Sequence, residues 1–330
     1  MEHFRICPVS SYYQRILLPV SYSLVFLLGL SLNGALLWCV CCGTRRWSST
    51  AIYMSNLAMA DLLYVLAMPP LIIANAMDGL WPFGNVLCKC VRFFFFVNLH
   101  CSMMFLTCIS VHRFLGVCFP IAAVRHRTKR VALFASGTVW VLAAAEIFPT
   151  LVFAHTGVIN NVTVCFEMTN PEHFKVYFPY GLFLAVVGFL VPFLVVVTCY
   201  CSMMRALYCR AADRISNCRA ACMRNKSLYT LLAVCLVFVV CFVPYHVART
   251  VYLFVRVYMP EDCALVNTAM ISFKAWKPVV SLNCCANPLL YFFGSGRHRE
   301  KVRAWLWRRK KRVQPSVCLV DVGSANRSGG

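Results

Sequence analysis

Acidic residues, and charged residues of any kind, are scarce in this sequence. Of its 330 residues only 11 are Asp or Glu, against 32 Lys and Arg, and charged side chains make up 13% of the chain. Hydrophobic residues make up 61%, and the mean hydropathy is +0.70. Soluble domains carry roughly a quarter charged residues. The composition therefore excludes a soluble globular protein and predicts a membrane protein.

Further absences narrow the class. The chain has no internal repeat and no low-complexity block, and no Ser-His-Asp, Cys-His or metal-ligand spacing survives the topology described below. We therefore expect no enzyme. An anion transporter or channel is a rival interpretation, because basic residues occur in the apolar stretches. The lack of repeats and of basic residues in the inner half, apart from Arg113, argues against a continuous path.

Apolar stretches are what this sequence has in abundance. A helix needs about 20 apolar residues to cross a bilayer, and seven stretches reach that length, at 17–42, 51–77, 86–118, 131–153, 178–204, 228–257 and 264–293. The sequence predicts an all-α membrane protein, a seven-transmembrane helix bundle over 17–293 that follows an amino-terminal segment, 1–16. Residues 294–312 mix basic and apolar side chains, which predicts a short amphipathic eighth helix on the inner leaflet. A disordered tail, 313–330, is expected to follow it.

Basic residues gather in alternate connectors. The segments 43–50, 119–130, 205–227 and 294–330 hold 22 Lys and Arg, whereas 1–16, 78–85, 154–177 and 258–263 hold 3. The first set is expected to be cytoplasmic, so the chain is predicted to be a multi-pass plasma-membrane protein with an extracellular amino terminus. The net charge of +21 then suits anionic membrane lipids and an acidic protein partner. Nucleic acid is not an expected partner.

Several cysteines fall on the predicted outer side, where disulfides persist. Cys88 opens the third span and Cys165 lies in the loop between spans four and five, while Cys7 and Cys263 lie in other outer segments. We expect disulfides 88–165 and 7–263, although sequence alone leaves the connectivity open. Asn161 begins the Asn-x-Thr triplet that falls in an outer loop and is the expected glycosylation site.

Four basic residues lie in the outer halves of the spans, Arg92, Arg249, Lys274 and Lys277. A charged group at membrane depth needs a wet cavity or a partner. His246 and Arg249 are three residues apart, as are the two lysines, so each pair shares a helix face. Neighbouring cations repel one another, and phosphate oxygens offset that repulsion well. The pattern predicts a cavity for a polyanionic ligand.

Other residues near this predicted cavity have two interpretations each. Phe95 and Phe96 lie beside Arg92 and either stack on a nucleobase or pack in the core. Glu167 is expected to hang over the cavity mouth. Glu146, in the fourth span, either partners a cation or is a buried neutral acid. For Arg256, near a span end, we expect the side chain to reach the outer headgroups.

A series of motifs occurs in order at fitting depths. They are Asn33, Asn56-Leu57-Ala58-Met59-Ala60-Asp61, Cys88, His112-Arg113-Phe114, Trp140, Pro192, Phe238-x-x-Cys241-Phe242-x-Pro244 and Asn287-Pro288-x-x-Tyr291. Together they resemble the class A (rhodopsin-like) G-protein-coupled receptors over residues 12–312.

Within that class the chain is similar to the metabotropic purinoceptors, the nucleotide receptors of the purinergic Y subfamily, and most similar to the members that respond to uracil nucleotides. The motifs that carry this resemblance are Trp81-Pro82-Phe83-Gly84, Cys108-Ile109-Ser110-Val111-His112-Arg113, His246-x-x-Arg249 and Lys274-x-x-Lys277. The resemblance implies that an extracellular nucleotide, UDP or UTP, binds with its phosphates at Arg92, Arg249 and Lys277. His246 and Lys274 lie beside these positions. The family usually has Arg at Lys277 and Tyr at Phe96.

The resemblance also implies partners and an activation switch. The partners are a heterotrimeric G protein of the Gq type, acting through phospholipase C and calcium, and arrestin. The switch positions are Asn33, Asp61, Ser102, His112, Arg113, Phe242, Pro244, Asn283, Asn287, Pro288 and Tyr291. Among them Asp61, Ser102, Asn283 and Asn287 are the positions expected to hold an allosteric sodium ion, and no other cofactor is expected.

Three further expectations concern the same predicted receptor. His112 replaces the usual acid beside Arg113, which predicts a weaker resting latch and higher basal activity. Cys318, in the tail, is either palmitoylated or a bare thiol. A rival ligand class for the same receptor is a carboxylate, such as a dicarboxylic acid or an acidic lipid.

Overall fold

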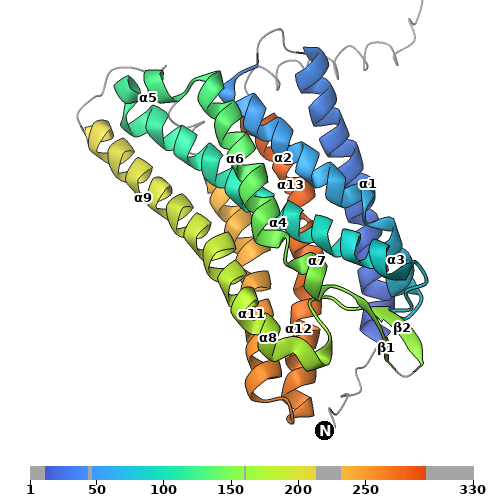
Figure 1. Ribbon diagram of the computed structural model, residues 1–330. Helices are drawn as coiled ribbons and strands as arrows, with labels where there is room; N and C mark the ends of the chain where they lie inside the picture. The colour runs from blue at the N-terminus through green and yellow to red at the C-terminus, as the bar shows by residue number, and fades with distance from the viewer. Residues whose placement is uncertain (1–11, 44–46, 160, 213–231, 295–330) are drawn as a thin grey trace, which may run out of the picture. The chain divides into compact units, whose positions relative to one another are not determined.

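The computed structural model describes residues 12–43, 47–159, 161–212 and 232–294. Its helices are α1 (Tyr12–Gly43), α2 (Ser49–Leu66), α3 (Pro69–Ala76), α4 (Gly84–Cys118), α5 (Pro120–His126), α6 (Lys129–Ile147), α7 (Thr150–Phe153), α8 (Phe174–Ala185), α9 (Val191–Ala212), α11 (Val243–Tyr258), α12 (Cys263–Ser281) and α13 (Asn283–Gly294) (Figure 1). Cys7, Cys318 and nearly all of the predicted eighth helix, from 295 on, lie outside the described residues, and so does the predicted tail.

Six of the described helical segments are long and apolar enough to cross a membrane. They are Arg15–Cys42, Ser49–Ala76, Gly84–Cys118, Lys129–Phe153, Pro171–Ala206 and Leu232–Tyr258, which match the first six predicted spans. The seventh predicted span corresponds to α12 and α13, which meet at Leu282. Its hydropathy is diluted by Lys274, Lys277 and several asparagines, so composition marks it less clearly than the others.

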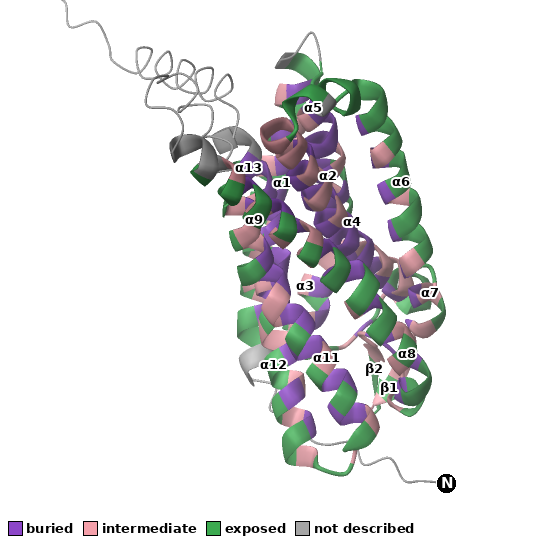
Figure 2. Cartoon of the chain, turned by 90° about the vertical axis from the view of Figure 1, so that its left-hand side faces the viewer, coloured by how far each residue is buried: buried purple, intermediate pink, exposed green. Residues whose placement is uncertain are grey.

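Large apolar side chains cover the outward faces of the helices. Leu27 is 60% exposed, Trp38 71% and Phe134 80%. Figure 2 shows the same pattern along α6, where exposed residues lie on the outer side and buried residues face the other helices. Such exposure would destabilise a soluble protein, whereas it suits contact with lipid. Several polar and charged side chains, among them Asp61, Arg249 and Lys277, are instead buried between the helices.

Two of the long helices contain a π-helical turn. One, η2 (Val186–Leu190), joins α8 to α9, and the other, η3 (Phe238–Phe242), leads into α11, where Pro244 is the second residue. Proline cannot donate the backbone hydrogen bond that a regular helix needs, and π-turns commonly accompany such irregularities. Pro244 was marked by the motifs as a switch position, whereas nothing in the motifs indicated the turn at 186–190.

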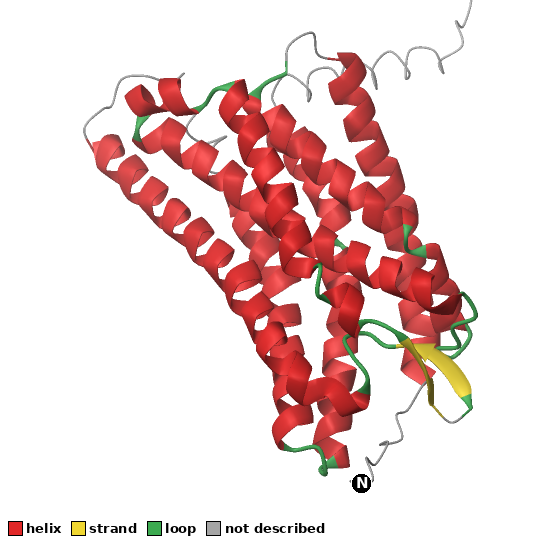
Figure 3. Cartoon of the chain, in the orientation of Figure 1, coloured by secondary structure: helices red, strands yellow, loops and turns green. Residues whose placement is uncertain are grey.

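A β-hairpin covers one end of the bundle. Its strands, β1 (Thr156–Ile159) and β2 (Val162–Cys165), pair antiparallel, and Asn161 in the turn has a φ of 63°, which Asn tolerates better than most residues (Figure 3). A disulfide joins Cys165 to Cys88 at the start of α4, with a Cα–Cα distance of 5.7 Å. The predicted 88–165 disulfide is therefore confirmed. We call this end the hairpin end, and the opposite one, near α5, the α5 end.

The other predicted disulfide is described only in part. Cys263, at the start of α12, is disulfide-bonded, whereas its predicted partner, Cys7, is not among the described residues.

Candidate functional site

A cavity of about 460 Å³ opens at the hairpin end. Helices α1, α3, α4, α11 and α12 contribute to its wall, together with β2 and the segment that follows it. Four of the predicted ligand-binding residues line it, Arg92, Glu167, Lys274 and Lys277. The volume is in the range of small-molecule sites, so the cavity has room for a ligand of nucleotide size.

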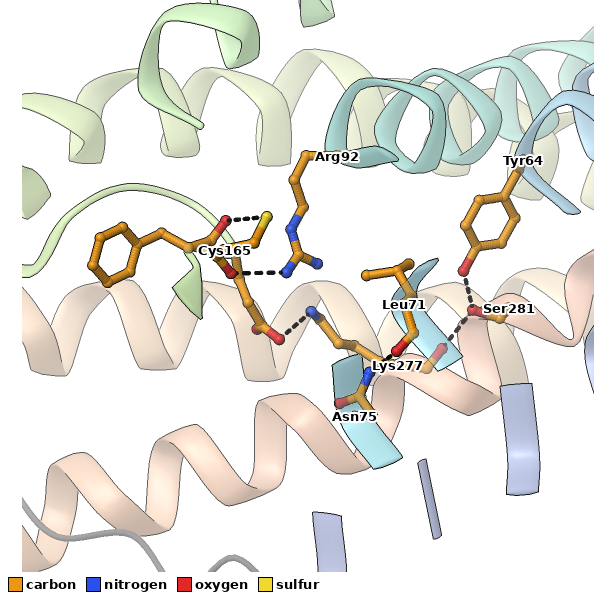
Figure 4. A network of polar contacts seen from close by, with 9 residues as sticks. Tyr64, Leu71, Asn75, Arg92, Cys165, Lys277 and Ser281 are labelled. Atoms are coloured by element: carbon orange, nitrogen blue, oxygen red, sulfur yellow. Dashed lines mark hydrogen bonds and ion pairs between the residues drawn. The ribbon is translucent and has the colours of Figure 1, made fainter. Parts of the chain in front are cut away.

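Arg92 and Lys277 approach the cavity from opposite helices. Figure 4 shows Arg92 extending from α4 towards the region that Lys277 reaches from α12. Nη2 of Arg92 donates to the carbonyl oxygen of Cys165 at 3.1 Å. The Lys277 ammonium lies 2.7 Å from Oε1 of Glu167, and the side chain of Lys277 is 7% exposed. The disulfide-anchored end of β2 and the segment after it thus supply partners for both cations.

Glu167 is the acid that faces this cluster. Burial alone would raise the pKa of its carboxyl, but Lys277, Lys274 and Arg92 together lower that pKa from 4.5 to about 2. The carboxylate is therefore ionised at every physiological pH. Its side chain is still 30% exposed, so the ion pair is open to exchange with another anion.

His246 and Arg249 lie in a second, more deeply buried layer and do not line this cavity. Arg249 is 1% exposed, and its guanidinium donates to the hydroxyl of Tyr177 at 2.8 Å and lies over the ring of Phe96 at 5.4 Å. The imidazole of His246 stacks on Phe189 with 4.3 Å between ring centroids. The predicted binding residues therefore form two layers.

Aromatic residues separate the two layers. Phe95 and Phe96 are buried, and the ammonium of Lys277 lies 5.9 Å from the centroid of the Phe95 ring. Several polar atoms beneath them have no hydrogen-bond partner among the described residues: both ring nitrogens of His246, Nε of Arg249 and the hydroxyl of Tyr245. Buried polar atoms rarely stay without partners, so this layer suits ordered water or the polar atoms of a deeply bound ligand.

Two further cations line the cavity. Arg256, which we expected to reach the headgroups, is 9% exposed and its guanidinium lies over the ring of Phe174 at 4.8 Å. The headgroup interpretation is therefore wrong for this residue. Arg15 also lines the cavity and pairs with Asp78 at 3.4 Å. Nothing in the sequence placed either residue here, because both lie near span ends, where basic residues are common.

Glu146 has a specific partner. Its Oε2 lies 2.9 Å from Nδ1 of His100, and the two side chains are 10% and 1% exposed. Neither interpretation of Glu146 named this partner, a histidine of α4. His100 was missed because no motif or spacing marks it.

Comparison with known proteins matches residues 32–291 to the seven-transmembrane receptor model of the rhodopsin family. The chain belongs to this family. It is 38% identical to the Y-type purinoceptor 3 of Gallus gallus over 314 residues, 95% of each chain. It is 42% identical to the Y-type purinoceptor 4 of Homo sapiens over 290 residues (87% of this chain, 78% of the relative) and 40% identical to the Y-type purinoceptor 6 of Rattus norvegicus over 296 residues (89% and 90%).

Within the rhodopsin family the chain is thus a member of the Y-type purinoceptors. This membership makes it a multi-pass receptor and not an enzyme, and it makes the helical bundle a seven-helix bundle in which α12 and α13 form the seventh span. The resemblance drawn from the motifs is confirmed.

The predicted switch of the receptor is centred on Asp61, which is fully buried. Its carboxylate accepts hydrogen bonds from the side-chain amides of Asn98 at 2.8 Å and Asn287 at 3.0 Å, and Ser102 lies 3.5 Å away. Asn283 precedes Asn287 by one helical turn and is also buried. No hydrogen bond joins its side chain to Asp61 in the described structure. Asn98 is the member of the cluster that the motifs did not indicate.

Side-chain oxygens are available around this carboxylate. The Oδ1 atoms of Asn33, Asn283 and Asn287 are buried and have no hydrogen-bond partner among the described residues. Oxygen atoms of this kind, with a carboxylate, are the donors that hard cations prefer. The residues therefore fit the sodium ion that the family resemblance implies.

The α5 end holds His112, one of the predicted switch positions. Nε2 of His112 accepts a hydrogen bond from Nε of Arg127 at 3.1 Å, and the backbone oxygen of Arg127 accepts one from Ser49 at 3.0 Å. His112 must be unprotonated at Nε2 to accept this bond. The neighbour of Arg113 is thus a neutral acceptor that binds a different arginine. The side chain of Tyr291 is not among those described.

Proposed function

We propose that this receptor binds an extracellular nucleotide, with UDP and UTP as the expected ligands, and signals through a G protein of the Gq type to phospholipase C and calcium. The observation that carries the proposal is the convergence of Arg92, Lys274 and Lys277 on one cavity, where Glu167 is the facing acid. The purinoceptor names of the relatives support a nucleotide over other anions. Phosphate groups carry more charge than a carboxylate and so offset this cluster better.

The ion pair at the cavity suggests how phosphates bind. A phosphate oxygen replaces the carboxylate of Glu167 at the Lys277 ammonium, while the Arg92 guanidinium supplies paired donors. A ligand that reaches deeper meets Arg249 and His246. It then draws the sixth and seventh spans towards the third. Binding energy that differs between two packings of the bundle shifts their populations.

The remaining parts of the proposal concern orientation and switching. The hairpin end is extracellular, and Asn161, exposed in the turn of the hairpin, carries the glycan. Asp61, Ser102, Asn283 and Asn287 would hold a sodium ion, which would supply positive charge beside the buried carboxylate. Heterotrimeric G protein and arrestin bind at the α5 end.

The decisive experiment measures calcium release in receptor-null cells that express this chain. UDP, UTP, ADP, ATP and a series of dicarboxylates are applied to the wild type and to Arg92→Ala. Lys175→Ala is the matched control, because Lys175 is exposed at the start of α8 and does not line the cavity. A nucleotide response that is lost in Arg92→Ala and kept in Lys175→Ala supports the proposal. A response to dicarboxylates alone, at normal surface expression, contradicts it.

A further inference from the structure

Glu146 is one of only two acids in the seven predicted spans, the other being Asp61. A carboxylate at membrane depth is retained only with a partner or a function. Asp61 already accepts hydrogen bonds from Asn98 and Asn287. Glu146 is therefore the acid available to the buried layer that holds Arg249.

Arg249 needs such an acid, because its hydrogen bonds go to neutral groups. The guanidinium donates to the Tyr177 hydroxyl at 2.8 Å and to the carbonyl oxygen of Gly181 at 3.5 Å. A buried cation without a counter-charge is strongly unfavourable. Tyr180 lies between the two residues: its hydroxyl donates to the backbone oxygen of Glu146 at 3.0 Å, and its ring meets that of Tyr177, the partner of Arg249, at 5.5 Å.

His100 links Glu146 to the fifth span. One side of its imidazole is held by the Glu146 carboxylate at 2.9 Å. The same edge of the ring, at Cε1 and Nδ1, fits against Gly188, in the π-helical turn η2, so closely that a Cβ atom at position 188 would overlap it. Any side chain at position 188 would therefore have to displace the His100 ring, which comes from α4. The position of the imidazole determines how near the two spans can come.

We propose that Glu146, acting through His100, is the internal counter-anion of Arg249 and holds the fifth span against the third at Gly188. The inference rests on the proposed function, because the event that relieves the hold is the arrival of a ligand phosphate at Arg249. The phosphate replaces the charge of Glu146, the guanidinium turns from Tyr177, and the fifth span is released. Glu146 and His100 do not line the cavity, so they are positioning residues.

Glu146→Gln tests the charge, since it keeps the shape of the side chain and its hydrogen-bonding oxygen. Without the counter-anion, Arg249 attracts phosphate more strongly, and His100 holds the fifth span less tightly against the third. We expect the concentrations of UDP and UTP for half-maximal response to fall about tenfold, and basal G-protein activation to rise. Damaged packing alone would instead raise those concentrations or reduce surface expression. Glu172→Gln, an exposed acid at the hairpin end, is the control and should change neither quantity.

A second pair of variants tests the contact with Gly188. In Gly188→Ala the added methyl group displaces the imidazole from Glu146, so the same gain in basal activity and potency is expected. Once His100→Ala has removed the ring, adding Gly188→Ala should change nothing more. Additive effects of the two substitutions would overturn the inference. If Glu146→Gln does not reach the surface, this pair decides the question.

The measurements separate this inference from the proposed function. Basal activation needs no ligand. An unchanged basal level in both Glu146→Gln and Gly188→Ala therefore overturns the inference that His100 holds the fifth span at Gly188, whatever the ligand is. A wild type that is silent to every nucleotide overturns the proposed ligand, and a raised basal level in the variants would then still support the hold. An unchanged or raised half-maximal concentration in Glu146→Gln, at normal surface expression, overturns the role of Glu146 as the counter-anion.

Discussion

The Glu167 carboxylate lies 2.7 Å from the Lys277 ammonium at the wall of the cavity. The pair joins the segment after the disulfide-anchored strand β2 to the seventh span. It means that the cavity contains its own anion when no ligand is bound. A ligand phosphate must therefore exchange with a carboxylate that the protein already supplies.

Replacement of Lys277 by Met removes the charge while keeping most of the side-chain volume. We expect the half-maximal concentration of the nucleotide to rise about tenfold to hundredfold, the equivalent of about 1.4 to 2.8 kcal/mol, because one phosphate contact is lost. Lys277→Arg should keep the response, since a guanidinium binds phosphate with two donors. Dose–response curves for calcium release, normalised to surface expression, measure both. Equal potency of Lys277→Met and the wild type would show that the ammonium does not bind the ligand.

The lowered pKa of Glu167 predicts how stability depends on pH. A carboxyl whose pKa is lower in the folded state than in the unfolded state stabilises the fold above its unfolded pKa, and that contribution is lost as the pH falls through the folded pKa. With an ordinary value of 4.5 and a folded pKa of about 2, the window lies between these values. The difference in Tm between the purified wild type and Glu167→Gln should therefore stay constant from about pH 8 to pH 5. A difference that changes within that range would contradict the assigned pKa.

The disulfide between Cys88 and Cys165 should contribute to both stability and binding. It spans 77 residues of sequence, and removing a native disulfide costs roughly 2–5 kcal/mol. Arg92 also uses the carbonyl oxygen of Cys165 as a partner, so loosening the hairpin disturbs a cavity residue. For Cys88→Ser with Cys165→Ser we expect a lower Tm and a weaker nucleotide response. Cys41→Ser, which replaces an exposed free cysteine, should leave both unchanged.

The spans, the disulfide and the membership of the receptor family were predictable because they depend on local composition and on ordered motifs. The cavity position of Arg92 and Lys277 followed from their depth in the spans. The burial of Arg249 beneath the cavity was not predictable, since it depends on how the sixth span is rotated and on the Tyr177 hydroxyl 72 residues away. The His100–Glu146 pair was not predicted either, because hydropathy and residue spacing within one helix do not show which residues of different helices are in contact.

The contact between His112 and Arg127 predicts a low barrier to basal activity at the α5 end. The bond from Arg127 Nε to His112 Nε2, at 3.1 Å, has a neutral acceptor. The guanidinium is charged but the imidazole is not, so the contact lacks the ion pair that a carboxylate would form in place of the imidazole. His112→Asp supplies a carboxylate to Arg127 and Arg113, so we expect nucleotide exchange on the G protein without ligand to fall several-fold. Arg127→Ala removes the donor and should raise it.

Both substitutions are measured in membranes with equal receptor amounts, and binding of the nucleotide should be nearly unchanged because these residues lie far along the bundle from the cavity. Basal exchange that is the same in His112→Asp as in the wild type would show that the latch does not depend on the charge of this acceptor. Basal exchange that falls in Arg127→Ala would show that Arg127 favours the active packing instead. Only the expected pair of opposite changes is consistent with a latch whose strength is limited by the neutral imidazole.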